Sequence, residues 1–93
     1  MTGLGRDELV AQQGRARRLA PHLASLSQSP DRLELAFGPG VDAALLQNLL
    51  AVERIACPFF RIDHDERTRR VTVSATDERG RPALAALAAA FSR

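Results

Sequence analysis

Apolar and polar residues alternate along this chain with two different periods, and the change of period predicts its elements. Over residues 7–27 the apolar residues recur every third or fourth position, which is typical of an amphipathic helix. Pro21 lacks a backbone donor, so we expect it to kink this helical segment or to begin a second short helix. Residues 27–31, rich in serine and ending Pro-Asp, then predict a linker.

Residues 31–93 predict a core with the order β-α-β-β-α. Residues 33–37 alternate between apolar and polar side chains, as a strand with one buried face does, and Gly38-Pro39-Gly40 ends that strand. A helix is expected over residues 41–56, because leucines recur there at helical spacing. Pro58 ends it, since the residue before a proline is driven out of the helical region.

The second half of the core predicts a hairpin and a final helix. Residues 59–63 and 70–76 are expected to pair around a tip at residues 65–68, so that Ile62 faces Val71 and Phe60 faces Val73. The other side of this ribbon would carry Phe59, Arg61, Asp63, Thr72, Ser74 and Thr76. The last helix begins near Pro82, because proline is favoured in a first helical turn.

This order of elements restricts the topology. A right-handed crossover from the first strand to the second, with the third inserted between them, predicts an α+β fold, a two-layer sandwich with a three-stranded, ferredoxin-like sheet. The first strand, at residues 33–37, would be an exposed edge, which proteins usually cover or pair. We therefore expect a homodimer formed by strand pairing or by a swapped N-terminal helix.

Length and composition support a single domain over residues 1–93. A chain of 93 residues has room for one hydrophobic core, and small chains without disulfides often gain stability by self-association. The single cysteine, Cys57, suits a reducing compartment. No signal-like start and no long apolar run is present, so we expect a cytoplasmic protein that does not span a membrane.

The net charge is +2, and all 13 basic residues behind it are arginines, because the chain has no lysine. Arginine with abundant alanine is what codon bias in a GC-rich genome produces, whereas phosphate-binding surfaces commonly mix both cations. The sheet would also expose only one aromatic residue, Phe59, for stacking on RNA bases. Nucleic-acid binding is thus not the favoured interpretation, although two clusters could contact an acidic partner: Arg15, Arg17 and Arg18, and Arg67, Arg69 and Arg70.

Candidate ligand-binding residues gather around Cys57. With Phe59, Arg61 and Asp63 it is expected to project toward the open face of the sheet, where a dimer contact or the floor of a small-molecule pocket would lie. The negative end of a helix does not activate a thiol, and a lone cysteine is more often a packed residue than a nucleophile. Cys57 and His64 lie too far apart along an extended segment to share one ion. A soft metal ion held by two Cys57 thiolates across a dimer axis remains open.

Catalysis has little support in the sequence. Asp63, Asp65 and Glu66 cluster near a predicted hairpin tip, where water keeps carboxylates from the shifted pKa values that acid–base work needs. Neither nucleotide-binding fingerprint is present. A small enzyme or auxiliary protein using Arg61, Asp63 or His64 in a pocket between sheet and helices remains an alternative.

The segment from Glu53 to Phe60 resembles a motif of small actinobacterial proteins, found also in tails of some metal-responsive regulators. In that motif a strand ending in Pro-Gly leads to a helix that finishes Glu-x-x-Cys-Cys-Pro-Phe-Phe. Cys57 corresponds to its second cysteine, and Ala56 stands where the first would be. The resemblance implies an association with thiols or heavy metals. We therefore predict a small homodimeric binding or accessory protein, with an enzyme or an arginine-mediated regulator as alternatives.

Overall fold

A computed structural model describes residues 4–92 of the chain and shows an α+β fold. It contains three α-helices and one four-stranded antiparallel sheet within that range. In chain order the elements are α1 (Arg6–Leu19), η1 (Ala20–His22), β1 (Leu23–Ser29), β2 (Arg32–Phe37), α2 (Ala43–Ala56), β3 (Phe60–Asp65), β4 (Arg70–Ala75), η2 (Glu78–Gly80) and α3 (Arg81–Phe91).

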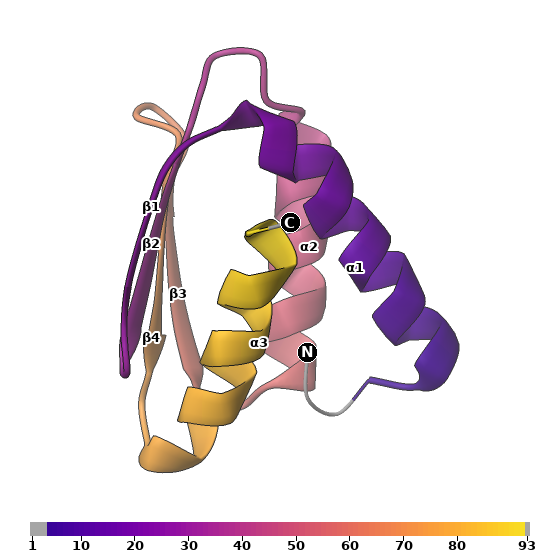
Figure 1. Ribbon diagram of the computed structural model, residues 1–93, viewed down its shortest axis with the longest axis vertical. Helices are drawn as coiled ribbons and strands as arrows, with labels where there is room; N and C mark the ends of the chain where they lie inside the picture. Colours follow the sequence, from indigo (N-terminus) through magenta and orange to yellow (C-terminus); the bar gives the residue numbers. More distant parts are fainter. Residues whose placement is uncertain (1–3, 93) are drawn as a thin grey trace.

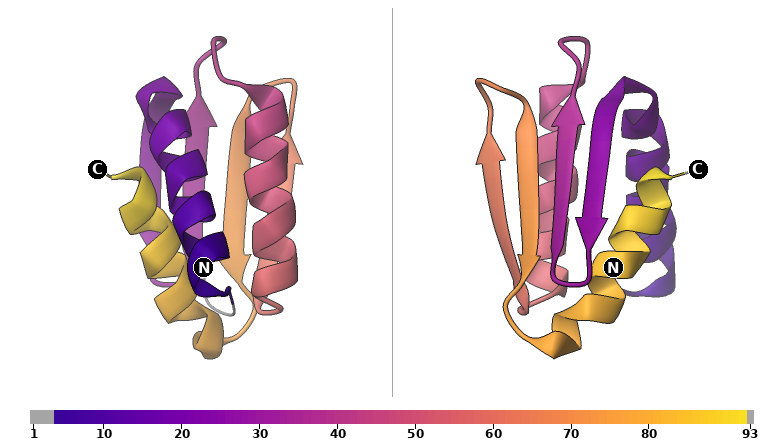
Figure 2. Two further views of the ribbon diagram at one scale, coloured as in Figure 1. Left: turned by 90° about the vertical axis from the view of Figure 1, so that its right-hand side faces the viewer. Right: turned by 60° about the vertical axis from the view of Figure 1, so that its left-hand side comes forward.

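The sheet has the strand order β1-β2-β4-β3, and each neighbouring pair is antiparallel. The predicted insertion of the last strand between the two before it is therefore confirmed. All three α-helices lie on one side of the sheet (Figure 1). Figure 2 shows α1 and α3 on the β1–β2 side and α2 on the β4–β3 side.

The N-terminal segment differs from the helix expected over residues 7–27. Helix α1 ends at Leu19, Pro21 lies in the short 3-10 turn η1, and the chain then forms strand β1 where the end of the helix and the start of the linker were expected. The sheet consequently has four strands, and the prediction of three is wrong. Strand β2 is also interior, because β1 pairs with it, so the predicted exposed edge at residues 33–37 is wrong as well.

The β3–β4 hairpin is present, but its register is shifted by two residues from the prediction. Ile62 pairs with Val73, Phe60 with Ala75 and His64 with Val71. A shift of two preserves which face each side chain occupies, because side chains alternate with a period of two. Val71 and Val73 are therefore buried as expected, and Phe60 and Ile62 pack against the core.

The core lies between the helices and the inner face of the sheet. Its buried members are Ala16, Leu19, Leu33, Leu35, Phe37, Leu46, Leu49, Leu50, Val71, Val73, Leu84, Leu87, Ala88 and Phe91. Helix α1 joins this core through Ala16 and Leu19 and packs against α2 and α3 of its own chain. A hydrogen bond from Gln12 Nε2 to Leu49 O, 2.7 Å long and buried, joins α1 to α2.

Candidate functional site

Cys57 lies at the junction of α2 and β3, where it caps the helix. Its backbone N–H donates to Glu53 O at 3.0 Å, and the exposed Pro58 follows it. The predicted position after a helix C-terminus is confirmed. Its side chain, however, is only 3% exposed, so the expectation that it projects toward the open face is wrong.

Metal binding has no preassembled ligand set in the residues that the structure describes. Residues 4–92 contain no group of three or more histidine, cysteine and acidic side chains placed to hold an ion. A site shared by two Cys57 thiolates would first require the thiol to become exposed, because Cys57 is buried within its own chain. The predicted soft-metal bridge therefore lacks an accessible ligand in this conformation.

Phe59 is half-buried beneath an arginine. The Arg79 Cζ atom lies 4.4 Å from the centroid of the Phe59 ring, a cation–π contact. Arg79 is held there by Asp77, whose carboxylate accepts from Arg79 Nε at 2.9 Å and from Nη2 at 3.0 Å. These hydrogen bonds lower the pKa of Asp77 from 3.8 to about 2. The ring of Phe59 is thus already covered by its own chain.

Arg61 and Asp63 occupy the outer face of the sheet, as predicted. Arg61 Nε lies 3.7 Å from Asp63 Oδ2, and both side chains are exposed. They face Ser74 and Thr72 across the ladder and are exposed, whereas Cys57 is buried. The four predicted ligand-binding residues are therefore not gathered at one site: Cys57 is buried, Phe59 is covered by Arg79, and Arg61 and Asp63 pair with each other in water.

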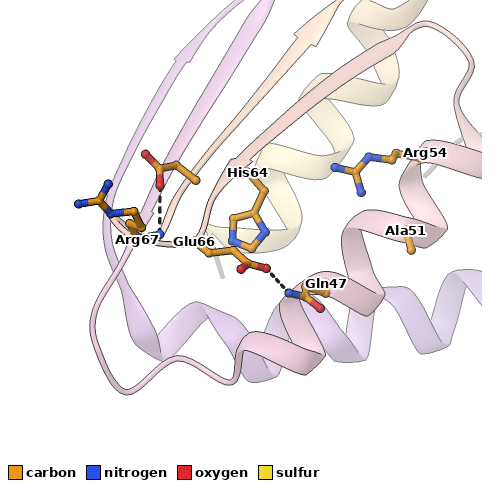
Figure 3. A pocket seen from close by; sticks show the side chains of 7 residues that line it. Gln47, Ala51, Arg54, His64, Glu66 and Arg67 are labelled. Carbon is orange, nitrogen blue, oxygen red and sulfur yellow. Dashed lines mark hydrogen bonds between the residues drawn. The ribbon is translucent and has the colours of Figure 1, made fainter.

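A different group of residues forms an open depression between α2 and the β3–β4 hairpin. Its volume is about 780 Å³. Figure 3 shows the side chains around it, with His64 between Arg54 on one side and Glu66 and Gln47 on the other. The lining residues are Gln47, Ala51, Arg54, His64, Asp65, Glu66 and Arg67.

The depression arises from how α2 and β3 lie against each other. Residues 47, 51 and 54 are spaced about one helical turn apart, so they fall on one face of α2. Ala51 contributes only a methyl group, which leaves space above it. His64 lies near the end of β3 on the helix-covered side, because it pairs with the buried Val71.

His64 and Arg54 have hydrogen-bonding capacity left at this depression. His64 is half-buried, and its ring makes no hydrogen bond or ion pair with any residue from 4 to 92. Arg54 makes one long bond, from Nη2 to Ile62 O at 3.5 Å. On the opposite wall, Gln47 Nε2 donates to Glu66 Oε1. The site combines an unengaged imidazole, a nearly free guanidinium and a carboxylate that is already bound.

Of these residues, sequence reasoning named His64 as a candidate but missed Arg54, Gln47 and Ala51. The helical spacing of residues 47, 51 and 54 is visible in the sequence, but nothing there shows that this face lies beside β3. Asp65 was expected to be a solvated turn residue: it is exposed, but it is the last residue of β3, and its Oδ1 accepts from the N–H of Arg67 in the turn at 3.0 Å.

Two of the six arginines in the predicted clusters make contacts within the chain. Arg15 Nη1 donates to Gln12 Oε1 at 2.8 Å, and Arg69 Nε donates to Phe37 O at 3.2 Å. Arg17, Arg18, Arg67 and Arg70 remain exposed. The clusters therefore offer fewer free cations to an acidic partner than their sequence suggests.

Comparison of the chain with protein-family models, with curated proteins and with solved structures finds no match. The resemblance of Glu53–Phe60 to the cysteine motif thus stays a prediction. Among the described residues, no helix has the length and apolar character needed to cross a membrane.

Proposed function

We propose that the protein is a small binding or accessory protein that holds a small anionic ligand in the depression between α2 and the β3–β4 hairpin. The observation that carries this proposal is the half-buried His64, whose ring makes no hydrogen bond within residues 4–92 and which faces the same space as Arg54. The anionic group would be a carboxylate or a phosphate.

The chemistry of the two side chains favours such a ligand. A guanidinium offers five N–H donors in a fixed fork that matches two oxygens of a carboxylate or phosphate, and Arg54 uses one of them weakly. An imidazole adds a ring N–H donor. Glu66 and Asp65 keep their negative charges and would repel an anion near them, but Glu66 Oε1 accepts from Gln47 on the far wall and Asp65 Oδ1 accepts from a backbone N–H of the turn. We therefore place the anionic group at the Arg54 side of His64.

The alternatives have weaker support. An enzyme using Arg61, Asp63 or His64 in a pocket between sheet and helices keeps only His64, since Arg61 and Asp63 lie on the outer face and His64 on the helix-covered face. Thiol or soft-metal binding through Cys57 requires a buried side chain to open. Arginine-mediated binding of nucleic acid predicts affinity that falls steeply with added salt.

We also propose a ferredoxin-like relationship and a cytoplasmic location for the protein. The run from β2 through α2, β3 and β4 to α3 supports a ferredoxin-like relationship, with β1 occupying the position beside β2 that a last strand would take. A cytoplasmic location is supported by the single cysteine, which suits a reducing compartment.

Titration followed by two-dimensional amide NMR tests the ligand site. We expect inorganic phosphate or succinate, added in separate arms, to shift the signals of His64, Ala51 and Glu66, and the stronger arm identifies the anionic group. Arg54→Gln should weaken binding about ten-fold or more, because a hydrogen bond to a charged group contributes about 1.5–3 kcal/mol. Arg61→Gln is the matched control, since it removes the same charge from the other face of the sheet.

A second pair of variants tests whether the ligand occupies the depression. Ala51→Leu should fill the depression and abolish the shifts, whereas Ala86→Leu, at an exposed position on α3, should leave them intact. The proposal is wrong if neither anion shifts His64 at millimolar concentration. It is equally wrong if Arg54→Gln and Arg61→Gln weaken binding to the same extent.

A further inference from the structure

Within the described residues 4–92, only one of the two edges of the sheet is covered. At the β3 edge, Phe60 N–H donates to Cys57 O at 3.3 Å, and Arg54 Nη2 reaches Ile62 O. Helix α2 contacts this strand, and charged side chains alternate along it. Such features are how proteins keep an edge strand from pairing with another chain.

Strand β1, at the other edge, has backbone groups that point away from the sheet. Phe37 N–H donates to Arg69 O at 3.0 Å, so the odd-numbered residues of β2 turn their backbone groups toward β4. The even-numbered residues of β2 therefore bond to β1, where they face Ser25, Ser27 and Ser29. By the same alternation, Leu26 and Gln28 direct their N–H and C=O groups outward.

The residues of β1 include none that would prevent another strand from pairing with this edge. Its seven residues, Leu-Ala-Ser-Leu-Ser-Gln-Ser, include no charge and no proline. Charged residues, prolines and covering segments are the usual protections of an exposed edge. A β-bulge is present, but it lies at the start of the strand, between Leu23 and Ser25, and leaves the rest regular.

We propose that β1 pairs antiparallel with β1 of a second copy of this chain, about a two-fold axis at Leu26. Leu26 would then face Leu26 of the other copy in a hydrogen-bonded pair, and Ser25 would face Ser27 of the other copy. The two four-stranded sheets would become one continuous sheet. This interface is separate from the Arg54 depression, which lies beside β3 at the opposite edge.

A second copy fits this edge for three reasons. Under a two-fold axis at Leu26 the outward groups of Leu26 match those of its own copy, Gln28 faces Ala24 of the other copy, and uncharged identical strands do not repel each other. Leu26 is half-buried on the helix-covered side, so its copy would cover apolar surface that still contacts water. On the outer face, the hydroxyl groups of Ser25 and Ser27 would lie side by side, a pairing that stabilises neighbouring strands.

The oligomeric state tests the interface. By light scattering on a sizing column we expect twice the 10.1 kDa mass of one chain. Gln28→Pro removes an outward N–H that no bond within residues 4–92 uses, so it should raise the dimer dissociation constant about ten-fold or more while the circular dichroism spectrum stays unchanged. Gln28→Ala, which keeps that N–H, should remain dimeric. A wild-type monomer, or a Gln28→Pro dimer as stable as wild type, overturns the proposal.

The register is tested without destabilising the strand. In the chain carrying both Ser25→Cys and Ser27→Cys, the new cysteines of two copies lie directly opposite, within the Cα spacing that a disulfide spans. Diamide should therefore link this variant into covalent dimers. Ser25→Cys alone should stay unlinked, because its copy lies two residues along the partner strand. Equal linking of both variants, or of neither, overturns the register and the two-fold axis at Leu26.

The outcome for this interface is independent of the ligand site. Arg54→Gln should leave the dimer mass unchanged, and Gln28→Pro should still bind the anion that wild type binds. A monomer that nevertheless captures a peptide along β1 would show that the edge serves another partner, and it counts against the proposal.

Discussion

The burial of Cys57 determines what its thiol can do. A thiol that is 3% exposed can meet a reagent only when the surrounding structure opens locally or unfolds. We therefore expect Ellman's reagent to modify Cys57 on the order of a hundred-fold more slowly in buffer than in concentrated urea. Gln13→Cys in a Cys57→Ser chain supplies an exposed comparison on α1. Similar rates for the two thiols in buffer would restore the surface-thiol hypothesis and, with it, the soft-metal bridge.

The segment around Cys57 also shows what the sequence could predict at this scale. The end of the helix at Pro58 and the outward direction of Arg61 and Asp63 follow from local rules, and both are confirmed. The expected outward direction of Cys57 assumes that the strand alternation extends back to residue 57. Strand β3 begins only at Phe60, and Cys57 belongs to the cap of α2, so the alternation does not apply to it.

At the scale of elements, β1 was missed because its bulge imitates a helix. Leu23 and Leu26 both lie on the inner side of the sheet, yet they are three positions apart, since the ladder shifts by one residue between Leu23 and Ser25. A spacing of three continues the helical pattern of Ala16, Leu19 and Ala20. The serines of β1 carry no strong preference that would have corrected it.

The β3–β4 hairpin illustrates a smaller error of the same kind. The turn covers residues 66–69, one position later than predicted, and Arg69 adopts a positive φ of 57° to close it. Glycine usually takes this conformation and other residues rarely do. Here an arginine takes it, so no glycine in the sequence marks the position of the turn. The candidate site could be predicted only in part for a similar reason. His64 is a candidate from the sequence, but which residues of α2 lie beside it depends on how the helix packs on the strand, which the local sequence does not show.

The junction between β4 and α3 predicts a pH dependence. Asp77 has a pKa of about 2 in the folded protein, against an ordinary 3.8, chiefly because it accepts hydrogen bonds from Arg79. A lowered pKa stabilises the fold fully above pH 3.8, and this contribution is lost as the pH falls toward 2. Urea denaturation at a series of acidic pH values should therefore show a shallower loss of stability for Asp77→Asn than for wild type.

Arg79→Gln provides the check on that cause. It removes the partner but keeps the carboxylate, so the pKa of Asp77 should rise toward its ordinary value, and the pH profile should flatten as it does for Asp77→Asn. A wild-type slope in both variants would mean that this pair contributes nothing to the acid sensitivity. The exposure of both side chains makes the effect small and sensitive to salt.

At the scale of the whole molecule, α1 is part of the same core as the sheet. Ala16 and Leu19 are fully buried within the common apolar cluster, and α1 packs on both α2 and α3. The buried side chain of Gln12 adds a polar connection, because its Nε2 donates to Leu49 O and its Oε1 accepts from Arg15. A helix held in this way has no separate core with which to unfold on its own.

We therefore expect the chain to unfold in one cooperative transition that includes α1. Gln12→Ala should lower the free energy of unfolding by about 1–3 kcal/mol, because it removes a buried hydrogen bond and leaves a cavity. Gln13→Ala, at the exposed neighbouring position, should change it little. Urea titrations followed both by circular dichroism and by the reactivity of Cys57 should give coincident curves for each variant. Two separated transitions, or equal effects of the two substitutions, would show instead that α1 is a peripheral element and that the core of the domain does not depend on it.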